Sequence, residues 1–163
     1  MSTFDQDPAY SQRVAGLMGD ISIVILRAHG MKEAKEYASE FLRLYSQAQS
    51  PIEALVATHL AAHASGGEVG VQPQAQIGEY RVDFLITCSG SKRAGIVIEC
   101  DGHNYHERTK EQAARDRRRD RWMQGQGFLV LRFTGSEIVS GDSTVAREIN
   151  QAIDGLLSEA ESN

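Results

Sequence analysis

The sequence predicts an α/β (α+β) fold in which a mixed sheet is flanked by helices and preceded by a helical extension. Apolar residues recur every three or four positions through the first third of the 163-residue chain, a spacing typical of amphipathic helices. Between residues 69 and 100 the pattern changes to the alternation and short apolar runs of strands. A polar helical segment then separates two apolar strands, which indicates a crossover between parallel strands.

Two helices are expected ahead of the core. The first should span about residues 8–28, and Gly30 should end it. The second repeats the amphipathic pattern over about residues 31–47. We therefore expect residues 1–48 to form an N-terminal helical extension and residues 49–163 to form the core domain.

The core should begin with a third helix, whose start is marked by a capping box. Ser50 suits the N-cap, Pro51 suits the first helical position, and Glu53 stands three residues after the serine. The helix should run to about His63, because the run Ser65-Gly66-Gly67 breaks the pattern.

Three strands should follow this helix. Residues 69–77 are β-like, and Pro73 within them indicates an edge strand or a bulge. Residues 81–87 alternate between apolar and polar side chains, and a turn cluster occupies 89–93. Residues 95–100 form an apolar strand that ends on charged residues.

A helix, a strand and a final helix should complete an α-β-β-β-α-β core. The helix covers about residues 105–124 and is strongly polar, whereas 128–133 reads as a short buried strand. An amphipathic helix over about 143–159 ends the pattern. The step across 95–133 should be a right-handed crossover that links parallel strands.

The composition excludes several classes of protein. Apolar residues make up 41% of the chain, too many for a disordered protein, and no run approaches the roughly 18 apolar residues of a membrane span. The N-terminus lacks the basic start and apolar core of a secretory signal. Cys88 and Cys100 are too few for a disulfide framework or a thiolate zinc cage, so a cytoplasmic location is the default.

Charge is distributed unevenly along the chain. The net charge of −5 argues against a general nucleic-acid binder. Residues 102–124, however, hold seven basic and four acidic side chains, whereas residues 136–163 hold one basic and six acidic. The basic segment is either a ridge that meets a polyanion or a solvated helix face with i,i+4 ion pairs.

Three carboxylates are expected on one face of a hairpin. If the strands pair antiparallel across the turn near residue 91, Asp83 lies opposite Glu99, and Asp101 shares their face. Because like charges that face each other destabilise a sheet, a cation is expected there. Carboxylate oxygens suit Mg²⁺ or Mn²⁺, which can activate water and stabilise charge on a phosphate. The alternative is that these carboxylates are simply solvated at a strand end.

His106 should open the following helix within a turn or two of these carboxylates. A histidine there can titrate near neutral pH and take a proton from water, although it could equally cap the helix or lie on the surface. Lys110 and Arg117 lie further along the same face, where they either stabilise a phosphate or are plain surface charges.

The combined pattern resembles the PD-(D/E)xK nuclease superfamily over about residues 50–140, and leaves the first 48 residues unexplained. The matching segments are Ser50-Pro51-Ile52-Glu53, residues 77–84, Val97-Ile98-Glu99-Cys100-Asp101-Gly102, Arg115-Asp116 and residues 127–134. More narrowly, the run is similar to small domains related to very-short-patch-repair endonucleases. The resemblance implies a restriction-endonuclease-like fold and metal-dependent hydrolysis of phosphodiester bonds in DNA.

The resemblance also implies roles for single residues. Asp83 and Glu99 match two metal ligands of the superfamily, and Glu53 matches a helical glutamate that some members add to the metal shell. The motif's lysine should stand two residues after Glu99, where this chain has Asp101.

The mismatch-repair relatives lack that lysine too and use a histidine beyond the strand. By that match His106 is the general base; alternatively, Lys110 is a lysine that has migrated to the helix. Asp101 is then either a further metal ligand or a partner that orients His106.

We therefore expect a Mg²⁺-dependent endonuclease or nickase that acts on DNA in repair, restriction or mobile-element biology. The phosphate backbone should be bound by Lys110, Arg115, Arg117, Arg118 and Arg121. Two alternatives stay open. The missing lysine favours a catalytically degenerate nucleic-acid-binding module, and the amphipathic segment 1–48 favours a homodimer or a module that docks a partner protein.

Overall fold

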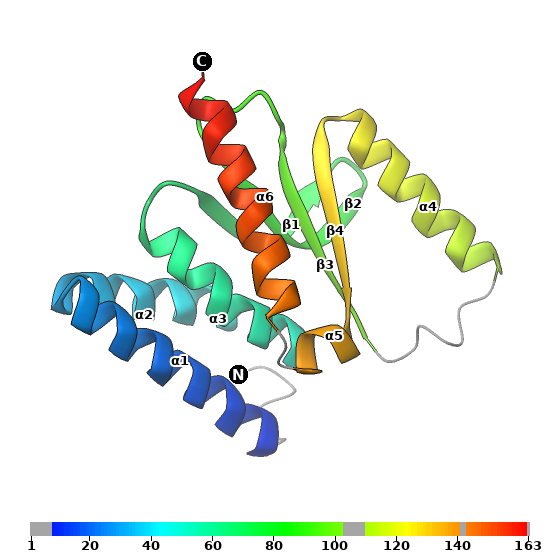
Figure 1. Cartoon of the computed structure of the whole chain (residues 1–163). Coiled ribbons are helices and arrows are strands. Elements are labelled where there is room, and N and C mark those ends of the chain that lie inside the picture. The colour runs from blue at the N-terminus through cyan, green and yellow to red at the C-terminus, as the bar shows by residue number, and fades with distance from the viewer. Residues whose placement is uncertain (1–7, 103–109, 141–142, 163) are drawn as a thin grey trace. The chain divides into compact units, whose positions relative to one another are not determined.

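The computed structural model describes residues 8–102, 110–140 and 143–162. The elements run in the order α1 (Pro8–Ala28), α2 (Met31–Tyr45), α3 (Pro51–Ser65), β1 (Gly70–Ile77), β2 (Tyr80–Thr87), β3 (Gly95–Asp101), α4 (Lys110–Gly125), β4 (Phe128–Thr134), α5 (Gly135–Ser140) and α6 (Thr144–Glu161) (Figure 1). Every predicted element is present, with described ends within two residues of the expected ones. The predicted start of the helix at residue 105 lies outside the described residues.

Contacts divide the chain into two compact units, Met1–Pro73 and Gln74–Asn163. In the first unit α2 packs against both α1 and α3. Tyr37 and Leu44 of α2 and Leu60 of α3 are fully buried, and the Tyr37 hydroxyl donates a hydrogen bond of 3.2 Å to the backbone oxygen of Thr58. This unit is therefore a small helical core to which the apolar faces of the amphipathic helices contribute.

The expected capping box starts α3. Ser50 Oγ accepts a hydrogen bond of 3.3 Å from the backbone N–H of Glu53. The Glu53 carboxylate accepts in return from Ser50 Oγ at 2.7 Å and from the backbone N–H of Gln49 at 2.8 Å. The box thus satisfies backbone donors that would otherwise lack partners at the helix start.

The sheet has the strand order β1-β2-β3-β4 and is mixed, as predicted. Strands β2 and β3 pair antiparallel, whereas β3 and β4 pair parallel across the α4 crossover. Strand β1, with its Pro73, lies at the edge of the sheet, where a residue without an N–H is tolerated.

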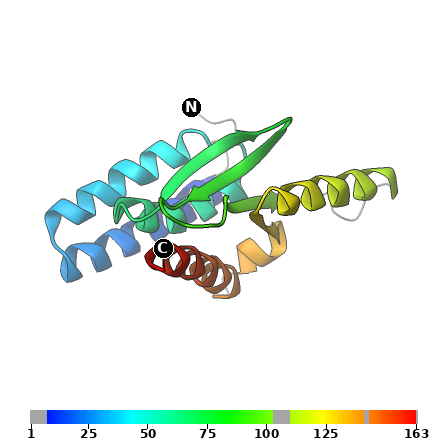
Figure 2. The same cartoon turned by 90° about the horizontal axis from the view of Figure 1, so that it is seen from above.

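The second unit has its own apolar core. Ala75, Ile77, Val82, Val97 and Met123 form one buried cluster. Met123 anchors the C-terminal end of α4 in this cluster. Helix α6 contacts β3 and crosses one face of the sheet, as Figures 1 and 2 show.

Helix α5 was not predicted. It starts at the end of β4, where the Thr134 hydroxyl accepts a hydrogen bond from the backbone N–H of Glu137 and the Glu137 carboxylate accepts from the backbone N–H of Thr134. This is a second capping box, with the spacing Thr-x-x-Glu. The sequence therefore held a signal for a helix start, but six residues are too few to show a helical repeat.

No helix within the described part of the chain is both long enough and apolar enough to cross a membrane.

Candidate active site

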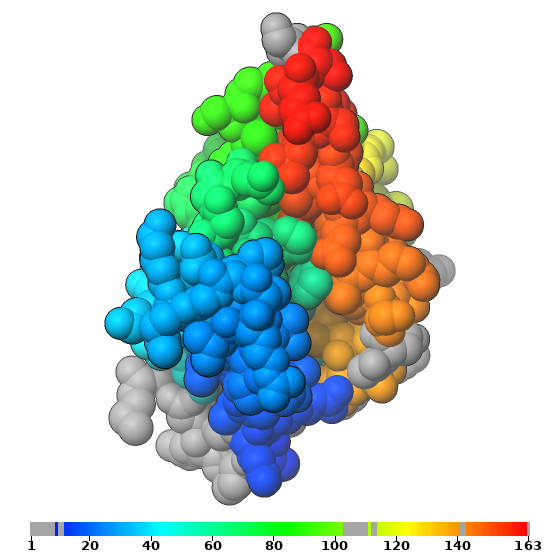
Figure 3. Space-filling model, turned by 60° about the vertical axis from the view of Figure 1, so that its left-hand side comes forward, coloured from blue at the N-terminus to red at the C-terminus, as the bar shows by residue number. Residues whose placement is uncertain are grey.

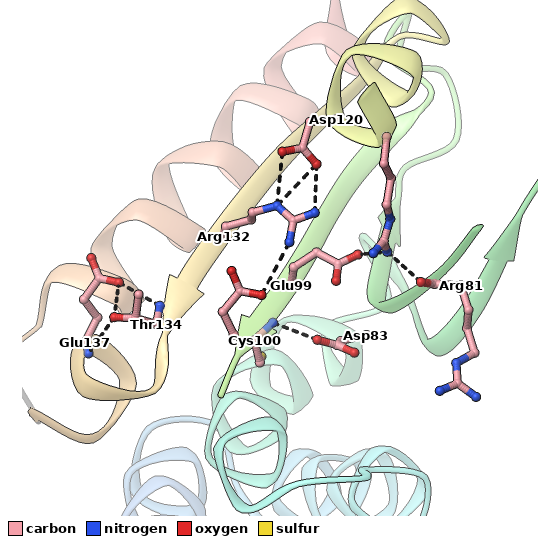
Figure 4. A network of polar contacts seen from close by, with 10 residues as sticks. Arg81, Asp83, Glu99, Cys100, Asp120, Arg132, Thr134 and Glu137 are labelled. Atoms are coloured by element: carbon pink, nitrogen blue, oxygen red, sulfur yellow. Dashed lines mark hydrogen bonds and ion pairs between the residues drawn. The ribbon is translucent and has the colours of Figure 1, made fainter. Parts of the chain in front are cut away.

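Asp83 and Glu99 lie at the end of the β2–β3 ladder, where Figure 4 shows Asp83 directed at the backbone of Cys100 and Glu99 directed at an arginine. The register pairs Phe84 with Ile98, so the next position along sets Asp83 against Glu99, as the sequence predicted. The Asp83 carboxylate accepts a hydrogen bond of 2.7 Å from the backbone N–H of Cys100. Asp83 therefore fixes the end of β3 at the point where the ladder stops.

Glu99 is a nearly buried carboxylate, with 6% of its surface exposed. It forms an ion pair with Arg119, which reaches it from α4. The same guanidinium group donates a hydrogen bond of 2.6 Å to the backbone oxygen of Arg81 on β2. Arg119 thus ties a helix to two strands, while its Nε has no acceptor among the described residues.

A second arginine, Arg132, contacts two further carboxylates of the site. Arg132 of β4 lies beside Glu99 in the parallel register. Its Nη2 is 2.8 Å from Asp120 Oδ1, and its Nη1 is 3.4 Å from Asp101 Oδ1. Arg132 therefore joins α4 to the end of β3 through two carboxylates (Figure 4).

The protonation of the site is shifted by burial. Burial raises the pKa of Glu99 to about 7, against the effect of Arg119, and the charge of Asp83 adds to the rise. Burial also raises the pKa of Asp83, although the Cys100 hydrogen bond and Arg119 oppose it. Burial alone would lower the pKa of Arg132, but Asp120 and the neighbouring carboxylates raise it overall, so Arg132 stays protonated.

The network contains more carboxylates than cations. Its ionisable members are Asp83, Glu99, Asp101, Asp120, Arg119 and Arg132. Four acidic groups against two guanidinium groups leave excess negative charge, which is the electrostatic condition for holding a cation.

The donor set suits a divalent cation in its chemistry, because Mg²⁺ and Mn²⁺ prefer carboxylate oxygens. Among the described residues, however, no three acidic, histidine or cysteine side chains are gathered closely enough to hold a metal ion. The reason is visible in the contacts, since Glu99 and Asp101 are each turned toward an arginine. A metal at this site would have to replace at least the Arg119–Glu99 pair.

Glu53 belongs to the N-terminal unit and is 5% exposed. Its capping role, predicted from the sequence, is confirmed by the hydrogen bonds at the start of α3. Its role as a metal ligand stays a prediction.

The predicted cationic groups fall into two sets. His106 lies outside the described residues, as does the side chain of Lys110 at the start of α4. The arginine side chains predicted to bind phosphate are all exposed on α4, namely Arg115, Arg117, Arg118 and Arg121. They are thus accessible to a polyanion.

Sequence reasoning missed the inward-facing members Arg119, Asp120 and Arg132. A signal for Arg119 existed, because it stands four residues before the buried Met123 and so shares its side of α4. Arg132 interrupts an otherwise apolar strand, and a charge in such a position needs a partner. Its partners come from two elements, Asp120 of α4 and Asp101 of β3, and the second of these depends on the β3–β4 register, which the sequence does not reveal.

Comparison with known proteins fits this architecture. Residues 53–153, well over half of the chain, match the REase_MTES_1575 family, and this segment includes every residue of the ion-pair network. The "Uncharacterized protein YcjD" of Escherichia coli (strain K12) is 38% identical over 80 residues, which cover 49% of this chain and 61% of that relative. No solved structure matches. The chain therefore belongs to the REase_MTES_1575 family of restriction-endonuclease-like domains, in agreement with the PD-(D/E)xK resemblance.

Proposed function

We propose that the protein is a Mg²⁺- or Mn²⁺-dependent endodeoxyribonuclease, either an endonuclease or a nickase. The observation that carries the proposal is the pair of carboxylates, Asp83 and Glu99, at the end of neighbouring strands in an excess of negative charge within a restriction-endonuclease-like domain. Asp83, Glu99 and Asp101 would hold the metal, and Glu53 would add to its shell. Such a metal supplies an activated water and stabilises charge on the phosphate.

The remaining residues act on the substrate. The exposed arginines of α4 would bind the phosphate backbone, which supplies affinity without sequence information. His106 would take the proton from the attacking water, and Lys110 is the alternative cation in place of the motif's lysine. Asp101 would either bind the metal or orient His106.

The test is cleavage of supercoiled plasmid and single-stranded DNA with Mg²⁺, Mn²⁺ or EDTA. Asp83→Asn is the informative variant, because its amide oxygen can still accept the Cys100 hydrogen bond while the charge is lost. Asp154→Asn, on the exposed side of α6, is the matched control. We expect metal-dependent cutting that Asp83→Asn loses and Asp154→Asn keeps. Equal cutting by both variants would refute the proposal.

A second candidate is a binding module that has lost catalysis. The ion pairs of Arg119 with Glu99 and of Arg132 with Asp101 favour it, because they neutralise these carboxylates without a metal. This module would bind DNA equally well in EDTA and in Mg²⁺ and would cut neither substrate.

The proposal extends to the wider setting of the protein. We place it in the cytoplasm, in DNA repair, restriction or mobile-element biology, and we propose very-short-patch-repair endonucleases as a functional parallel. Residues 49–163 would form the catalytic core, and residues 1–48 would form an extension with a separate role.

That separate role would be pairing with a second copy of the chain. Helix α1 exposes Ile23 and Val24, at 46% and 64%, and part of its outer surface is seen in Figure 3. If a second α1 packs antiparallel about a two-fold axis between these residues, Asp20 of each copy lies opposite Arg27 of the other. The charges on this face therefore complement each other.

The oligomeric state tests this pairing. Light scattering should give a dimer for the intact chain and a monomer for Val24→Glu, because the added carboxylate would be buried next to its own copy. Glu33→Gln, in the first turn of α2, serves as a control and should remain dimeric. A monomeric wild-type protein would exclude the dimer.

A further inference from the structure

Two aromatic rings meet where the β1–β2 turn approaches α4. Tyr80 and Trp122 form an edge-to-face pair with ring centroids 5.3 Å apart. Trp122 is the single tryptophan of the chain, and 37% of it is exposed. The neighbouring Met123 is fully buried, and Tyr80 packs against the same core cluster.

The backbone of the turn fixes the position of the indole. Gly78 has a φ of +58°, and a Cβ atom at this residue would lie 2.7 Å from Cη2 of Trp122. The turn therefore approaches the ring more closely than any other residue would allow. Met123 anchors the same turn of α4 in the core, and the contact with Gly78 restricts the indole itself.

Charges of both signs border this aromatic pair, since a hydrogen bond with Glu79 raises the pKa of the Tyr80 hydroxyl while Arg118 and Arg119 lower it. The guanidinium carbon of Arg119 lies 5.8 Å from the centre of the Tyr80 ring. Arg115 and Arg118 precede Trp122 by seven and four residues, so these exposed side chains form a stripe along one side of α4. An exposed aromatic residue at the end of an arginine stripe is the arrangement by which proteins bind single-stranded nucleic acid.

The aromatic pair is also linked directly to the acidic site. Arg119 contacts the Tyr80 ring and forms the ion pair with Glu99. A nucleotide stacked on the aromatic pair would therefore lie next to Arg119, and the same arginine contacts the carboxylate of Glu99. Scattered exposed apolar residues are common on protein surfaces and need no explanation. This one differs because arginines flank it and one of them belongs to the site.

We propose that Trp122 and Tyr80 form a stacking site for an unpaired nucleobase whose phosphates follow Arg115 and Arg118. The ligand class is single-stranded or gapped nucleic acid, because the bases of a continuous duplex do not offer a free face. The proposal rests on the proposed function in that the bound strand is the one presented to the acidic site.

Fluorescence of the single tryptophan tests the proposal in the intact chain. Oligonucleotides are titrated in EDTA, so that no cutting occurs: a single strand, its duplex, and an abasic strand of equal length and charge. We expect the single strand to quench Trp122 and the abasic strand to bind with little quenching. Comparing the DNA and RNA versions of each strand shows which of the two nucleic acids the site binds more tightly. Equal quenching by the base-containing and abasic strands would overturn the proposal.

Affinity measurements on variants give an independent readout. We expect Trp122→Leu to weaken binding of the single strand roughly 5- to 150-fold, the range for loss of one stacked base, and to change duplex binding by less than about twofold. Trp122→Phe should keep most of the affinity and controls for folding. An unchanged ratio of single-strand to duplex affinity in Trp122→Leu would contradict the site.

The two proposals can fail separately. If only the nuclease proposal is wrong, metal-dependent cutting is absent, whereas base-dependent quenching in EDTA is retained. If only the stacking site is wrong, Asp83→Asn still abolishes cutting. Trp122→Leu then changes the cutting rate by the same factor on gapped and on continuous substrates.

Discussion

A carboxylate as buried as Glu99 loses most of its hydration, and Arg119 compensates by pairing with it. Replacing Arg119 by Met would leave that carboxylate without its cation. We expect a loss of about 1.5–3 kcal/mol in the free energy of unfolding. The loss should stay below the roughly 3–5 kcal/mol of a fully buried pair, because Glu99, whose pKa is about 7, can take up a proton.

Urea denaturation measures this effect, and a double-mutant cycle isolates it. Combining Arg119→Met with Glu99→Leu should cost less than the sum of the two single changes. Arg117→Gln, on the exposed side of the same helix, should change stability by less than about 0.5 kcal/mol. Strict additivity in the cycle would show that the pair contributes nothing.

Tyr37 is a second residue whose ionisation is coupled to folding. Burial raises the pKa of its phenol to about 12, above the value of about 10 in an unfolded chain. Because the folded state favours the neutral form of the phenol, the contribution of Tyr37 to the free energy of unfolding is complete below pH 10. This contribution is lost as the pH rises through 12. The hydrogen bond to Thr58 acts in the same direction, since a phenolate cannot donate it.

Tyr37→Phe should therefore be less stable than wild type by about 0.5–1.5 kcal/mol at neutral pH. The difference should shrink between pH 10 and 11.5, because Tyr37 then ionises in the unfolded wild-type chain but stays mostly neutral in the folded one, whereas the phenylalanine of the variant ionises in neither. Urea midpoints at pH 8, 10 and 11.5 measure it. A difference that is constant over this range would contradict the account.

At the scale of elements, the start of β3 depends on a glycine. Gly95 has a φ of +149°, and a Cβ atom there would lie 2.5 Å from the backbone oxygen of Ile86. We expect Gly95→Ala to destabilise the protein by about 1–3 kcal/mol, because both the conformation and the close contact oppose a side chain.

Gly125 offers the matched control. A Cβ atom at this residue meets nothing within 4 Å, and its φ is not positive. Gly125→Ala should be neutral or stabilising by up to about 1 kcal/mol, as measured by thermal unfolding. Equal effects of the two substitutions would show that the contact with Ile86 carries no cost.

The elements themselves could be predicted because each has a long periodic signal. The amphipathic repeat of α1 and the alternation of β2 gave boundaries within two residues. Helix α5 was missed because six residues hold less than two turns.

The site could be predicted only in part. The hairpin turn near residue 91 fixes which β2 residue faces Glu99, so Asp83 was found. Arg132 could not be placed, because α4 separates β3 from β4 and nothing in the sequence sets their register. Arg119 was read as one more basic residue of a charged helix, although its spacing from Met123 turns it inward.

At the scale of the whole molecule, an acidic protein with a net charge of −5 gathers five of its thirteen arginines on one helix, α4. Four of these five are exposed on α4, and the inward-facing Arg119 meets the carboxylate of Glu99 on the sheet. A single helix therefore serves both the surface that would bind a polyanion and the site that would cut it. The family match covers this part of the chain and leaves α1 and α2 outside it.

Binding of Mn²⁺ tests the central claim most directly, because the account requires the Asp83–Glu99 pair to hold a metal in place of Arg119. Electron paramagnetic resonance of free Mn²⁺ during a titration reports binding without depending on cleavage. We expect wild type and Asp154→Asn to bind Mn²⁺ alike and Asp83→Asn to lose at least tenfold in affinity, about 1.4 kcal/mol. Wild-type protein that leaves Mn²⁺ free, or binding that Asp83→Asn does not change, would contradict the account.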